Sequence, residues 1–285
     1  MKTKKLSHSK KNTSDSLYNI KIKGDINLNL KEKIIVVTGA ASGIGRALAI
    51  RFNQEGAKKI IAVDMNIEGA QETANLVNGE AMHADVSKEV DIKNVINKTE
   101  SEIGPIDLFC SNAGIAAGRD LQSPNEDWQK IWDINVMSHV YAARHLVPRM
   151  VSRGGGYFLN TSSAAGLLNQ IGGCAYGVTK HAAVGFAEWL AIHYKHQGIK
   201  VSLLCPQAVR TPMTAVESDS IKAAANNGMI DPEDLAETVV QELEKESFVI
   251  LPHPIVLEYM RNKTNNYDRW IGGMNKLMRK ITGVI

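Results

Sequence analysis

The sequence predicts a single α/β domain, in which a doubly wound parallel sheet of about seven strands carries helices on both faces. From residue 33 onward, short apolar runs rich in β-branched residues alternate with stretches of helical periodicity. Nothing rich in Pro, Gly or Ser interrupts residues 31–257 for long enough to be a linker. With 44% hydrophobic residues, the 285-residue chain has enough apolar surface for a core of this size.

Seven short segments carry the strand prediction, separated mostly by stretches with helical periodicity. The third, "GEAMHADVS", is the weakest and is placed by its spacing between stronger runs. In chain order the predicted strands lie in residues 34–40, 59–65, 79–87, 107–114, 157–163, 200–206 and 247–253.

Capping residues mark the start of two predicted helices. Ser87 is expected to be the N-cap of a helix over residues 88–103, which a Gly-Pro pair ends. Asp231 is expected to open a second helix, with Pro232 at its first position and acidic residues in its first turn.

Composition argues against several classes of protein. No run of 18 apolar residues and no signal-peptide layout occurs, so we expect neither a membrane span nor secretion but a cytoplasmic protein. Three cysteines without a C-x-x-C pair predict reduced thiols, and the closely spaced His193 and His196 lack acidic or cysteine partners, so no metal site is expected. Basic residues gather at the ends rather than the middle, which disfavours nucleic-acid binding except through the basic N-terminal arm.

Three glycines follow the first strand directly, in "VVTGAASGIGRA". Gly39, Gly43 and Gly45 suit a tight turn, a bare backbone against a pyrophosphate, and close packing of helix on strand. The amides and positive dipole end of the helix would face the phosphates. The spacing G-x-x-x-G-x-G departs from the G-x-G-x-x-G fingerprint, and such turns also occur for purely structural reasons.

The second strand ends in Asp64, about 20 residues past the last glycine, where a carboxylate accepts hydrogen bonds from the ribose hydroxyls of an adenosine. A 2′-phosphate would meet a like charge there. Arg46 lies beyond the glycines and would attract that phosphate, but no basic residue follows Asp64 closely. These residues favour NAD over NADP, while a helix N-cap or turn role remains the alternative for Asp64.

Tyr176 and Lys180 lie four residues apart in a predicted helix over residues 174–195, so both side chains share one face. A free phenol has a pKa near ~10, and a neighbouring cation favours the phenolate. Lys180 together with a positive nicotinamide ring would make Tyr176 a general acid and base. The pair by itself occurs by chance in many helices, but Ser162 and Ser163 also end a strand at the edge where doubly wound sheets bind ligands.

Together these motifs resemble the short-chain dehydrogenase/reductase family over residues 33 to about 254. The resemblance implies a Rossmann-like fold and an NAD-dependent oxidoreductase acting on a secondary alcohol or ketone. It rests on T-G-x-x-x-G-I-G at Thr38 to Gly45, Asp64, Asp85-Val86, N-A-G at Asn112 to Gly114, Asn135, the serine and Y-x-x-x-K.

The resemblance assigns the catalytic roles. It selects Ser163, 13 residues before the tyrosine, to orient the substrate oxygen, and Tyr176 to exchange the proton. Lys180 would hold the nicotinamide ribose and lower the pKa of the tyrosine, and Asn135 would support a water in the proton relay. The implied cofactor contacts are Gly39, Ser42, Gly43, Ile44, Gly45, Asp64, Asp85, Val86, Asn112, Ala113, Gly114, Tyr176, Lys180, Pro206, Val209 and Thr211.

The resemblance also implies a homotetramer or dimer, formed through the helix over 174–195 and one around 136–150. Two departures from the family pattern stand out. Gln207 follows Pro206 where glycine is usual, and "CSNAG" replaces the commoner Asn-Asn-Ala-Gly. An NADP-dependent carbonyl or 3-oxoacyl-type reductase and a non-catalytic dinucleotide sensor are the alternative functions.

The remaining segments are expected to border the substrate. Small and apolar residues in 164–168, 172–174 and 207–213 predict a hydrophobic substrate, and residues 213–229 form either a mobile lid or an ordinary surface loop. Residues 1–30 read as a flexible basic extension.

Residues 258–285 mix large apolar side chains with Arg and Lys, which predicts a helical extension docked over the cleft or on a neighbouring subunit. A membrane-surface helix fits the same composition. Gly272 and Gly273 are expected to interrupt a long helix there, which disfavours that alternative.

Overall fold

A seven-stranded parallel sheet runs through the part of the chain that the computed structural model describes, residues 29–216 and 218–284. Its strand order is β3-β2-β1-β4-β5-β6-β7, and each strand overlaps one of the seven predicted segments, with β5 and β6 beginning one residue earlier than predicted. The predicted fold class is therefore confirmed. The strands are β1 (Ile34–Thr38), β2 (Lys59–Asp64), β3 (Gly79–His83), β4 (Leu108–Ser111), β5 (Gly156–Thr161), β6 (Ile199–Leu204) and β7 (Val249–Ile250).

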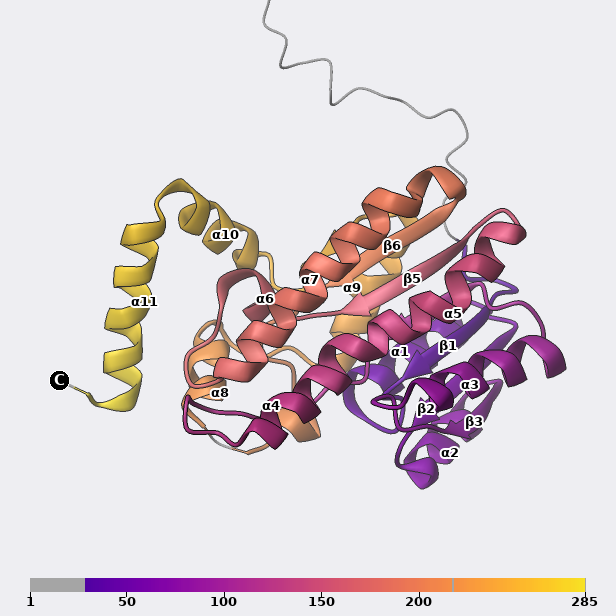
Figure 1. Ribbon diagram of the computed structural model, residues 1–285, viewed down its shortest axis with the longest axis horizontal. Coiled ribbons are helices and arrows are strands. Elements are labelled where there is room, and N and C mark those ends of the chain that lie inside the picture. The colour runs from indigo at the N-terminus through magenta and orange to yellow at the C-terminus, as the bar shows by residue number, and fades with distance from the viewer. Residues whose placement is uncertain (1–28, 217, 285) are drawn as a thin grey trace, which may run out of the picture.

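Helices cover both faces of this sheet (Figure 1). The α-helices are α1 (Gly43–Gln54), α2 (Ile67–Leu76), α3 (Glu89–Glu102), α4 (Asn125–Trp132), α5 (Ser138–Ser152), α6 (Ala165–Leu168), α7 (Cys174–Tyr194), α8 (Asp219–Ala224), α9 (Pro232–Glu244), α10 (Ile255–Asn265) and α11 (Tyr267–Thr282). Short helices of other types are the π-helix η1 (Asp133–Met137) and the 3₁₀-helices η2 (Lys195–Gln197), η3 (Pro212–Thr214) and η4 (Ala225–Asn227).

Two apolar layers separate the helices from the sheet, as the alternation of side chains along a strand requires. Ile35 and Val37 belong to the core cluster shared with α1, α2 and α9. Val36, between them, belongs to the cluster shared with α3, α5 and α7. Both faces of each central strand are thus buried, which explains why these strands are continuous apolar runs rather than alternating ones.

The strand order places a crevice between β1 and β4. From β1 the chain winds outward through β2 and β3, then returns to the other side of β1 as β4. At such a switch point the loops after the two strands diverge, and ligands bind between them at the carboxyl edge. The glycine turn after β1 and the Asn-Ala-Gly segment after β4 both lie at this edge.

The start of α3 differs from the prediction. Lys88, not Ser87, is the N-cap, because the hydroxyl of Ser87 donates to the Oδ1 atom of Asp85 at 2.6 Å instead of capping the helix. The second predicted start is confirmed: α9 begins at Pro232 with Asp231 as N-cap. The side chain of Asp231 does not bond the helix, however, and pairs with Arg210 at 2.9 Å.

The C-terminal region forms two helices that extend to one side of the molecule (Figure 1). The expected interruption at Gly272 and Gly273 is wrong, because α11 runs through both. Each glycine costs a helix only about 1 kcal/mol. The break lies instead at Asn266, whose side chain caps α11 by accepting from the amide of Arg269 at 2.9 Å.

Most of the predicted N-terminal extension lies outside the described residues. Its last residue, Leu30, is only 2% exposed and packs in the core cluster with α1 and α9. Within the described ranges, no helix combines the length and the apolar character needed to cross a bilayer.

Candidate active site

The glycine turn after β1 is held against the segment after β4. Gly39 has a φ of +69°, and a Cβ atom there would lie 2.9 Å from the Cα atom of Ala113. Gly45 packs α1 onto the turn so closely that a Cβ atom would lie 2.1 Å from the carbonyl oxygen of Gly39. Gly43 has a φ of +51° and faces Thr211, whose Cγ2 atom would lie 3.0 Å from an added Cβ. The three glycines therefore permit the positive φ angles and the close backbone packing of this turn, and they also leave its backbone free of side chains.

The first turn of α1 is open to an anion. Its N-cap Ser42 has extended backbone angles, and its side chain makes no capping hydrogen bond. The first amides of a helix, here including those of Gly43 and Ile44, have no acceptor within the helix. They add to the positive end of the dipole, which makes this end of α1 a ready site for a phosphate group.

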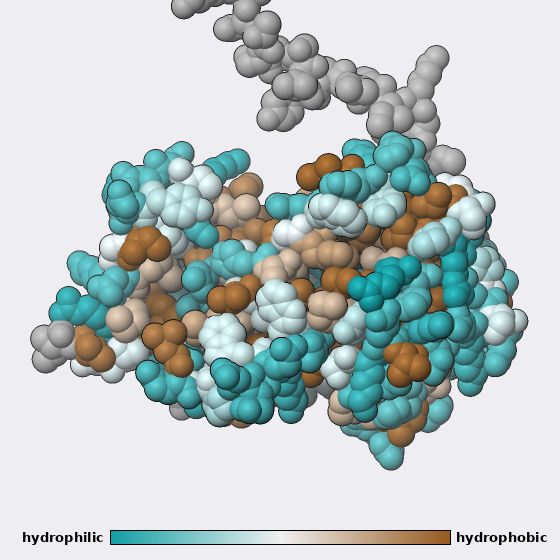
Figure 2. Space-filling view, viewed as in Figure 1, coloured by the Kyte–Doolittle hydropathy of each residue, from teal (hydrophilic) through white to brown (hydrophobic). Residues whose placement is uncertain are grey.

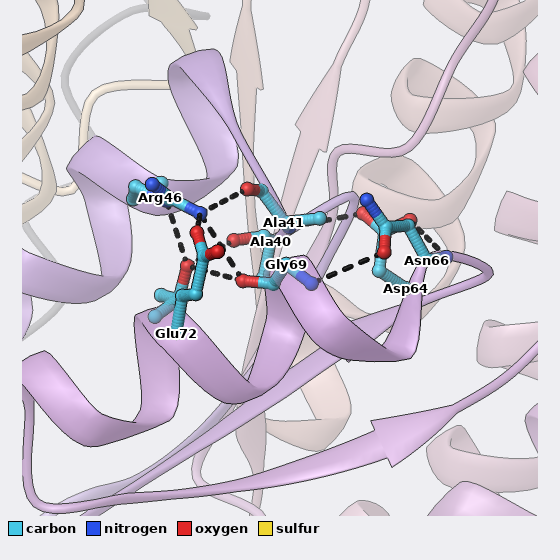
Figure 3. Close-up of polar contacts among 8 residues, drawn as sticks. Ala40, Ala41, Arg46, Asp64, Asn66, Gly69 and Glu72 are labelled. Atoms are coloured by element: carbon cyan, nitrogen blue, oxygen red, sulfur yellow. Dashed lines mark hydrogen bonds and ion pairs between the residues drawn. The ribbon is translucent and has the colours of Figure 1, made fainter.

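Asp64 ends β2 beside this turn (Figure 3). Its Oδ2 atom accepts from the amide of Ala41 at 3.0 Å, and its Oδ1 atom accepts from the amide of Asn66 at 2.9 Å. The N-cap alternative for Asp64 is wrong, because Asn66 holds that position and accepts from the amide of Gly69 at 3.1 Å, whereas the bond from the amide of Asn66 to Asp64 fits the turn alternative. A carboxylate has about four acceptor sites, so Asp64 can still accept from a ligand.

Arg46 and Asp64 lie on opposite sides of Ala41 and Gly69 (Figure 3). The guanidinium donates to the carbonyl oxygen of Ala41 at 2.6 Å and to that of Gly69 at 3.2 Å. It also pairs with Glu72 at 2.8 Å and donates to the hydroxyl of Thr73 at 3.0 Å. The guanidinium of Arg46 is thus hydrogen-bonded to protein groups, and its charge is balanced by the carboxylate of Glu72.

Asp85 and Val86 lie just past the end of β3. Asp85 accepts from the amide of Ser87 at 3.0 Å, as well as from its hydroxyl, and lies 3.5 Å from the ammonium of Lys88. Burial alone would raise the pKa of Asp85, but these partners hold it below its ordinary value. Val86 is buried against α3 in the core.

The hydroxyl of Thr38 joins the ends of β1 and β4. It accepts from the amides of Asn112 at 2.9 Å and Ala113 at 3.1 Å, and it donates to the carbonyl oxygen of Cys110 at 3.2 Å. The side-chain amide of Asn112 donates to the carbonyl oxygen of Thr38 at 3.0 Å and accepts from Thr161 at 3.2 Å. The floor of the crevice is therefore cross-linked through three strands.

Asn135 lies in the π-helix η1 and is fully buried. Its side chain accepts from the amide of Ile115 at 2.9 Å and donates to the carbonyl oxygen of Ile115 at 3.0 Å. A Cβ atom on Gly114 would lie 3.2 Å from the Oδ1 atom of Asn135 and 3.3 Å from the Nζ atom of Lys180. Gly114 thus lets the asparagine and the ammonium approach one another.

The structure separates the roles of the two serines after β5. The hydroxyl of Ser162 donates to the carbonyl oxygen of Lys180 at 2.8 Å and so anchors α7. Ser163 lines the cavity described below, donates to the carbonyl oxygen of Pro206 at 3.3 Å and accepts from the amide of Ala165 at 3.1 Å. Ser163 and Tyr176, which the resemblance assigns to the same substrate oxygen, both line this cavity.

Lys180 reaches past Tyr176 along the same face of α7. Its Nζ atom lies 5.7 Å from the centre of the tyrosine ring and donates to the carbonyl oxygen of Thr161 at 3.1 Å. Burial lowers the pKa of Lys180 to about 8. Burial also raises the pKa of Tyr176 above its ordinary value, although a hydrogen bond with Ser163 opposes the rise. The expected lowering of the tyrosine pKa is therefore not a property of the protein alone.

Pro206, Val209 and Thr211, the last three residues expected to contact the cofactor, lie after β6. The carbonyl oxygen of Pro206 accepts from the amide of Ala164 at 2.8 Å. Val209 is buried and pairs with Ile230 in an isolated parallel bridge. The amide of Thr211 donates to the hydroxyl of Thr214 at 3.1 Å, within a reciprocal cap that begins η3.

A cavity of about 1230 Å³ opens at this edge of the sheet. Ser163, Tyr176 and Gln207 line it, together with small and apolar residues after β5. The sequence also predicts that the C-terminal region borders the substrate, and Tyr259, Trp270, Met274 and Leu277 of that region do line the cavity. The segment over 213–229, expected to be a lid or a surface loop, contains η3, α8 and η4 in its described residues and lines the cavity as well.

Sequence reasoning missed one wall of this cavity. Ile115, Ala116, Ala117, Arg119 and Asp120 line it from the loop between β4 and α4. Their position directly after the Asn-Ala-Gly segment at the carboxyl edge was the available signal.

Known proteins resemble this chain over most of its length. A family model described as short chain dehydrogenase matches residues 33–222. Epidermal retinol dehydrogenase 2 of Mus musculus is 32% identical over 235 residues, covering 79% of this chain and 75% of that protein. 1-deoxy-11-beta-hydroxypentalenate dehydrogenase of Streptomyces exfoliatus is 32% identical over 231 residues, covering 78% of this chain and 84% of that protein.

Solved structures show the same architecture. The crystal structure of a short chain dehydrogenase/reductase from Burkholderia phymatum in complex with NAD superposes with a TM-score of 0.77 at 26% sequence identity. The match covers 85% of this chain and 96% of that one.

Proposed function

The chain belongs to the short-chain dehydrogenase/reductase family, and from that premise we propose that it is an NAD-dependent oxidoreductase acting on a secondary alcohol or ketone. The observation that carries the proposal is the meeting of Ser163 and Tyr176 in one cavity, with Lys180 one helical turn behind the tyrosine. A phenol, a hydroxyl donor and an ammonium are the groups needed to bind a carbonyl oxygen and exchange a proton with it.

The residues at the β1–β4 crevice fit a nicotinamide dinucleotide. The open first turn of α1 suits its pyrophosphate, and the free acceptor sites of Asp64 suit the hydroxyls of its adenosine ribose. Asp85 and Val86 would border the adenine, Asn112 to Gly114 the middle of the cofactor, and Pro206, Val209 and Thr211 its carboxamide end. When bound, the nicotinamide supplies the acceptor or donor of the hydride.

The protein residues handle the substrate oxygen. In the direction of oxidation, Ser163 would donate to this oxygen while Tyr176, as phenolate, takes the hydroxyl proton. In the direction of reduction, the neutral phenol gives the proton back. Lys180 stabilises the phenolate by its charge, and Asn135 positions the loop at Ile115 beside that charge.

We favour NAD over NADP because of the charges near the adenosine end. The carboxylate of Asp64 would repel a 2′-phosphate. Arg46, the residue that would attract it, is occupied by Glu72 and three other protein groups. An NADP-dependent reductase remains the alternative within the same family.

We propose a bulky hydrophobic substrate. The cavity volume of about 1230 Å³ exceeds what a small alcohol fills, and small-molecule sites are usually about 300–1,000 Å³. Its apolar wall includes Trp270, Met274 and Leu277 from α11. Two relatives act, by their names, on retinol and on a hydroxypentalenate.

A homo-oligomer, tetramer or dimer, is proposed on the surface of α4, α5 and α7. Brown and white side chains gather across the middle of this face (Figure 2). Trp132 is 39% exposed, Val178 46%, and Trp189 46%, although all three are large and apolar. A cytoplasmic location stays a prediction of the sequence, as does the absence of a nucleic-acid partner.

Initial rates with NAD or NADP over a panel of secondary alcohols and ketones of increasing size would test this function. We expect turnover with NAD that Tyr176→Phe abolishes while NAD binding, measured by calorimetry, persists. Tight NAD binding without turnover of any alcohol or ketone would contradict the proposal and favour the non-catalytic sensor.

A further inference from the structure

Helices α5 and α7 cover one face of the sheet (Figure 1). A group of buried polar side chains lies beneath these helices. Ser111 of β4 and Asn160 of β5 are paired in register, so they stand side by side. Each lies two residues after a phenylalanine, Phe109 or Phe158, that packs in the core cluster of this face. Because side chains alternate along a strand, Ser111 and Asn160 point toward the same helices.

His139 lies on α5, one helical turn after Asn135, and its side chain approaches that of Asn160. Its exposed fraction is 2%, against 1% for Asn160 and 3% for Ser111. Both ring nitrogens of His139, the Nδ2 atom of Asn160 and the Oγ atom of Ser111 lack a hydrogen bond of good geometry, although the side chains of His139 and Asn160 lie close enough to interact. Buried polar groups in proteins are almost always paired with protein or with ordered water, so three neighbouring residues with such atoms indicate a site for a small polar ligand.

The ammonium of Lys180 borders this group. It donates to the carbonyl oxygen of Thr161, the residue next to Asn160, and an ammonium has two further donors. Burial, aided by the charge of Lys180 and opposed by an interaction with Asn160, lowers the pKa of His139 to about 4. The imidazole is therefore neutral near pH 7 and offers one acceptor and one donor nitrogen.

No second charge competes with Lys180 for these atoms. The titratable groups that face it are Tyr176 on α7, Cys205 on β6 and His139 on α5. Burial raises the pKa of Cys205 to about 12, so that its thiol is neutral. The cluster is thus an uncharged set of donors and acceptors beside one cation.

We propose that Ser111, His139 and Asn160 form a buried hydration site, and that His139, through a water held there, positions the ammonium of Lys180. The water fits this chemistry because it donates to one group while accepting from another, and buried waters usually make about three hydrogen bonds. His139 is a positioning residue in this arrangement, since it acts on the reaction only through Lys180. The hydrogen bond stabilises the charged form of Lys180 against its burial.

A crystal structure of the wild-type protein at about 1.5 Å resolution tests the site directly, whatever the protein acts on. We expect density for a water within hydrogen-bond distance of His139 and of Asn160 or Ser111. A structure in which side chains close this space, or in which it is empty, overturns the proposal.

The positioning role is tested by the pKa of Lys180, followed by NMR in protein labelled at the lysine Cε carbon and assigned with Lys180→Arg. We expect His139→Leu to lower this pKa by about one unit, a tenfold change in the protonation ratio. His139→Gln, which keeps polar atoms, should restore most of it. An unchanged pKa in His139→Leu overturns the positioning role.

Two further variants serve as a second probe of the site and as a matched control. Ser111→Ala removes one partner of the water with little change in volume, and should lower the same pKa by a smaller amount if His139→Leu does not fold; no shift in Ser111→Ala would then overturn the proposal. His145→Leu removes another histidine of α5, one that pairs with Glu89 near the surface, and should leave the pKa of Lys180 unchanged.

Discussion

The Nζ atom of Lys180 lies 5.7 Å from the centre of the Tyr176 ring, with its own hydrogen bond directed to the carbonyl oxygen of Thr161. In the part of the chain that the structure describes, no hydrogen bond joins this ammonium to the phenol oxygen, so in the proposed mechanism the lysine acts on the phenol through its charge. Burial meanwhile raises the pKa of Tyr176 and lowers that of Lys180, so each group is less ionised than in water. The proposed proton exchange at Tyr176 would thus depend on keeping Lys180 charged.

Tyr176→Phe should lower kcat by about a hundredfold to ten-thousandfold, the usual contribution of a general acid or base. Lys180→Met should lower kcat similarly and also weaken NAD binding. Steady-state rates and calorimetric NAD binding check both variants. Equal rates in wild type and Tyr176→Phe would remove Tyr176 from the mechanism.

Asp64→Ala should raise the ratio of kcat/KM for NADP to that for NAD by about tenfold or more, since tenfold corresponds to about 1.4 kcal/mol of lost repulsion and lost ribose contacts. Glu72→Gln in the same background should raise the ratio further, because it releases Arg46 from its ion pair. The measurement is initial rate against the concentration of each cofactor. An unchanged ratio in Asp64→Ala would contradict the assignment of the ribose site.

Gly45→Ala should destabilise the protein, because the new Cβ atom would lie 2.1 Å from the carbonyl oxygen of Gly39. Overpacking of this kind costs about 1–3 kcal/mol. Gly185→Ala is the matched control: it is also helical, and nothing lies within 4 Å of its added Cβ. Thermal unfolding should show a lower Tm for the first and an equal or higher Tm for the second.

Trp270→Ala should raise KM for bulky hydrophobic substrates and leave that for small ones nearly unchanged. Trp270 lines the cavity and contacts the ring of Tyr259 at 6.2 Å between centroids. Ile271→Ala is the control, since its side chain is 60% exposed on the same helix. Similar KM changes for small and bulky substrates would show that α11 does not select by size.

His139 should make folding stability depend on pH in the acid range. Its pKa is about 4 in the folded protein, against about 6.5 in an unfolded chain, so the unfolded state takes up the proton first as pH falls. Stability should fall from about pH 6.5 to about pH 4 by up to about 1.4 kcal/mol per unit through this group. Urea unfolding of wild type and His139→Leu over this range should show a shallower slope in the variant.

The architecture and the edge that carries the site were predictable from local patterns. Apolar runs located six of the seven strands and spacing located β3, and the chain order placed the glycine turn, Asp64 and the serines at strand ends. Such features depend on residues close in sequence, and so a single sequence reveals them.

What sequence reasoning missed depends on competition between distant or alternative partners. Ser87 is a good capping residue, but Asp85 captures its hydroxyl. Two glycines looked sufficient to end a helix, yet Asn266 sets the boundary. Nothing near His139 or Ser111 in sequence shows that both side chains are buried.

The expected cofactor contacts come largely from the chain before residue 115, whereas α8, α10 and α11 supply one wall of the cavity. This division allows the substrate cavity and the proposed cofactor site to change independently of one another. Substitutions in the later helices can redirect the enzyme to molecules of another shape while the dinucleotide half stays as it is. New specificities can therefore arise, or be engineered by grafting, at little risk to the chemistry.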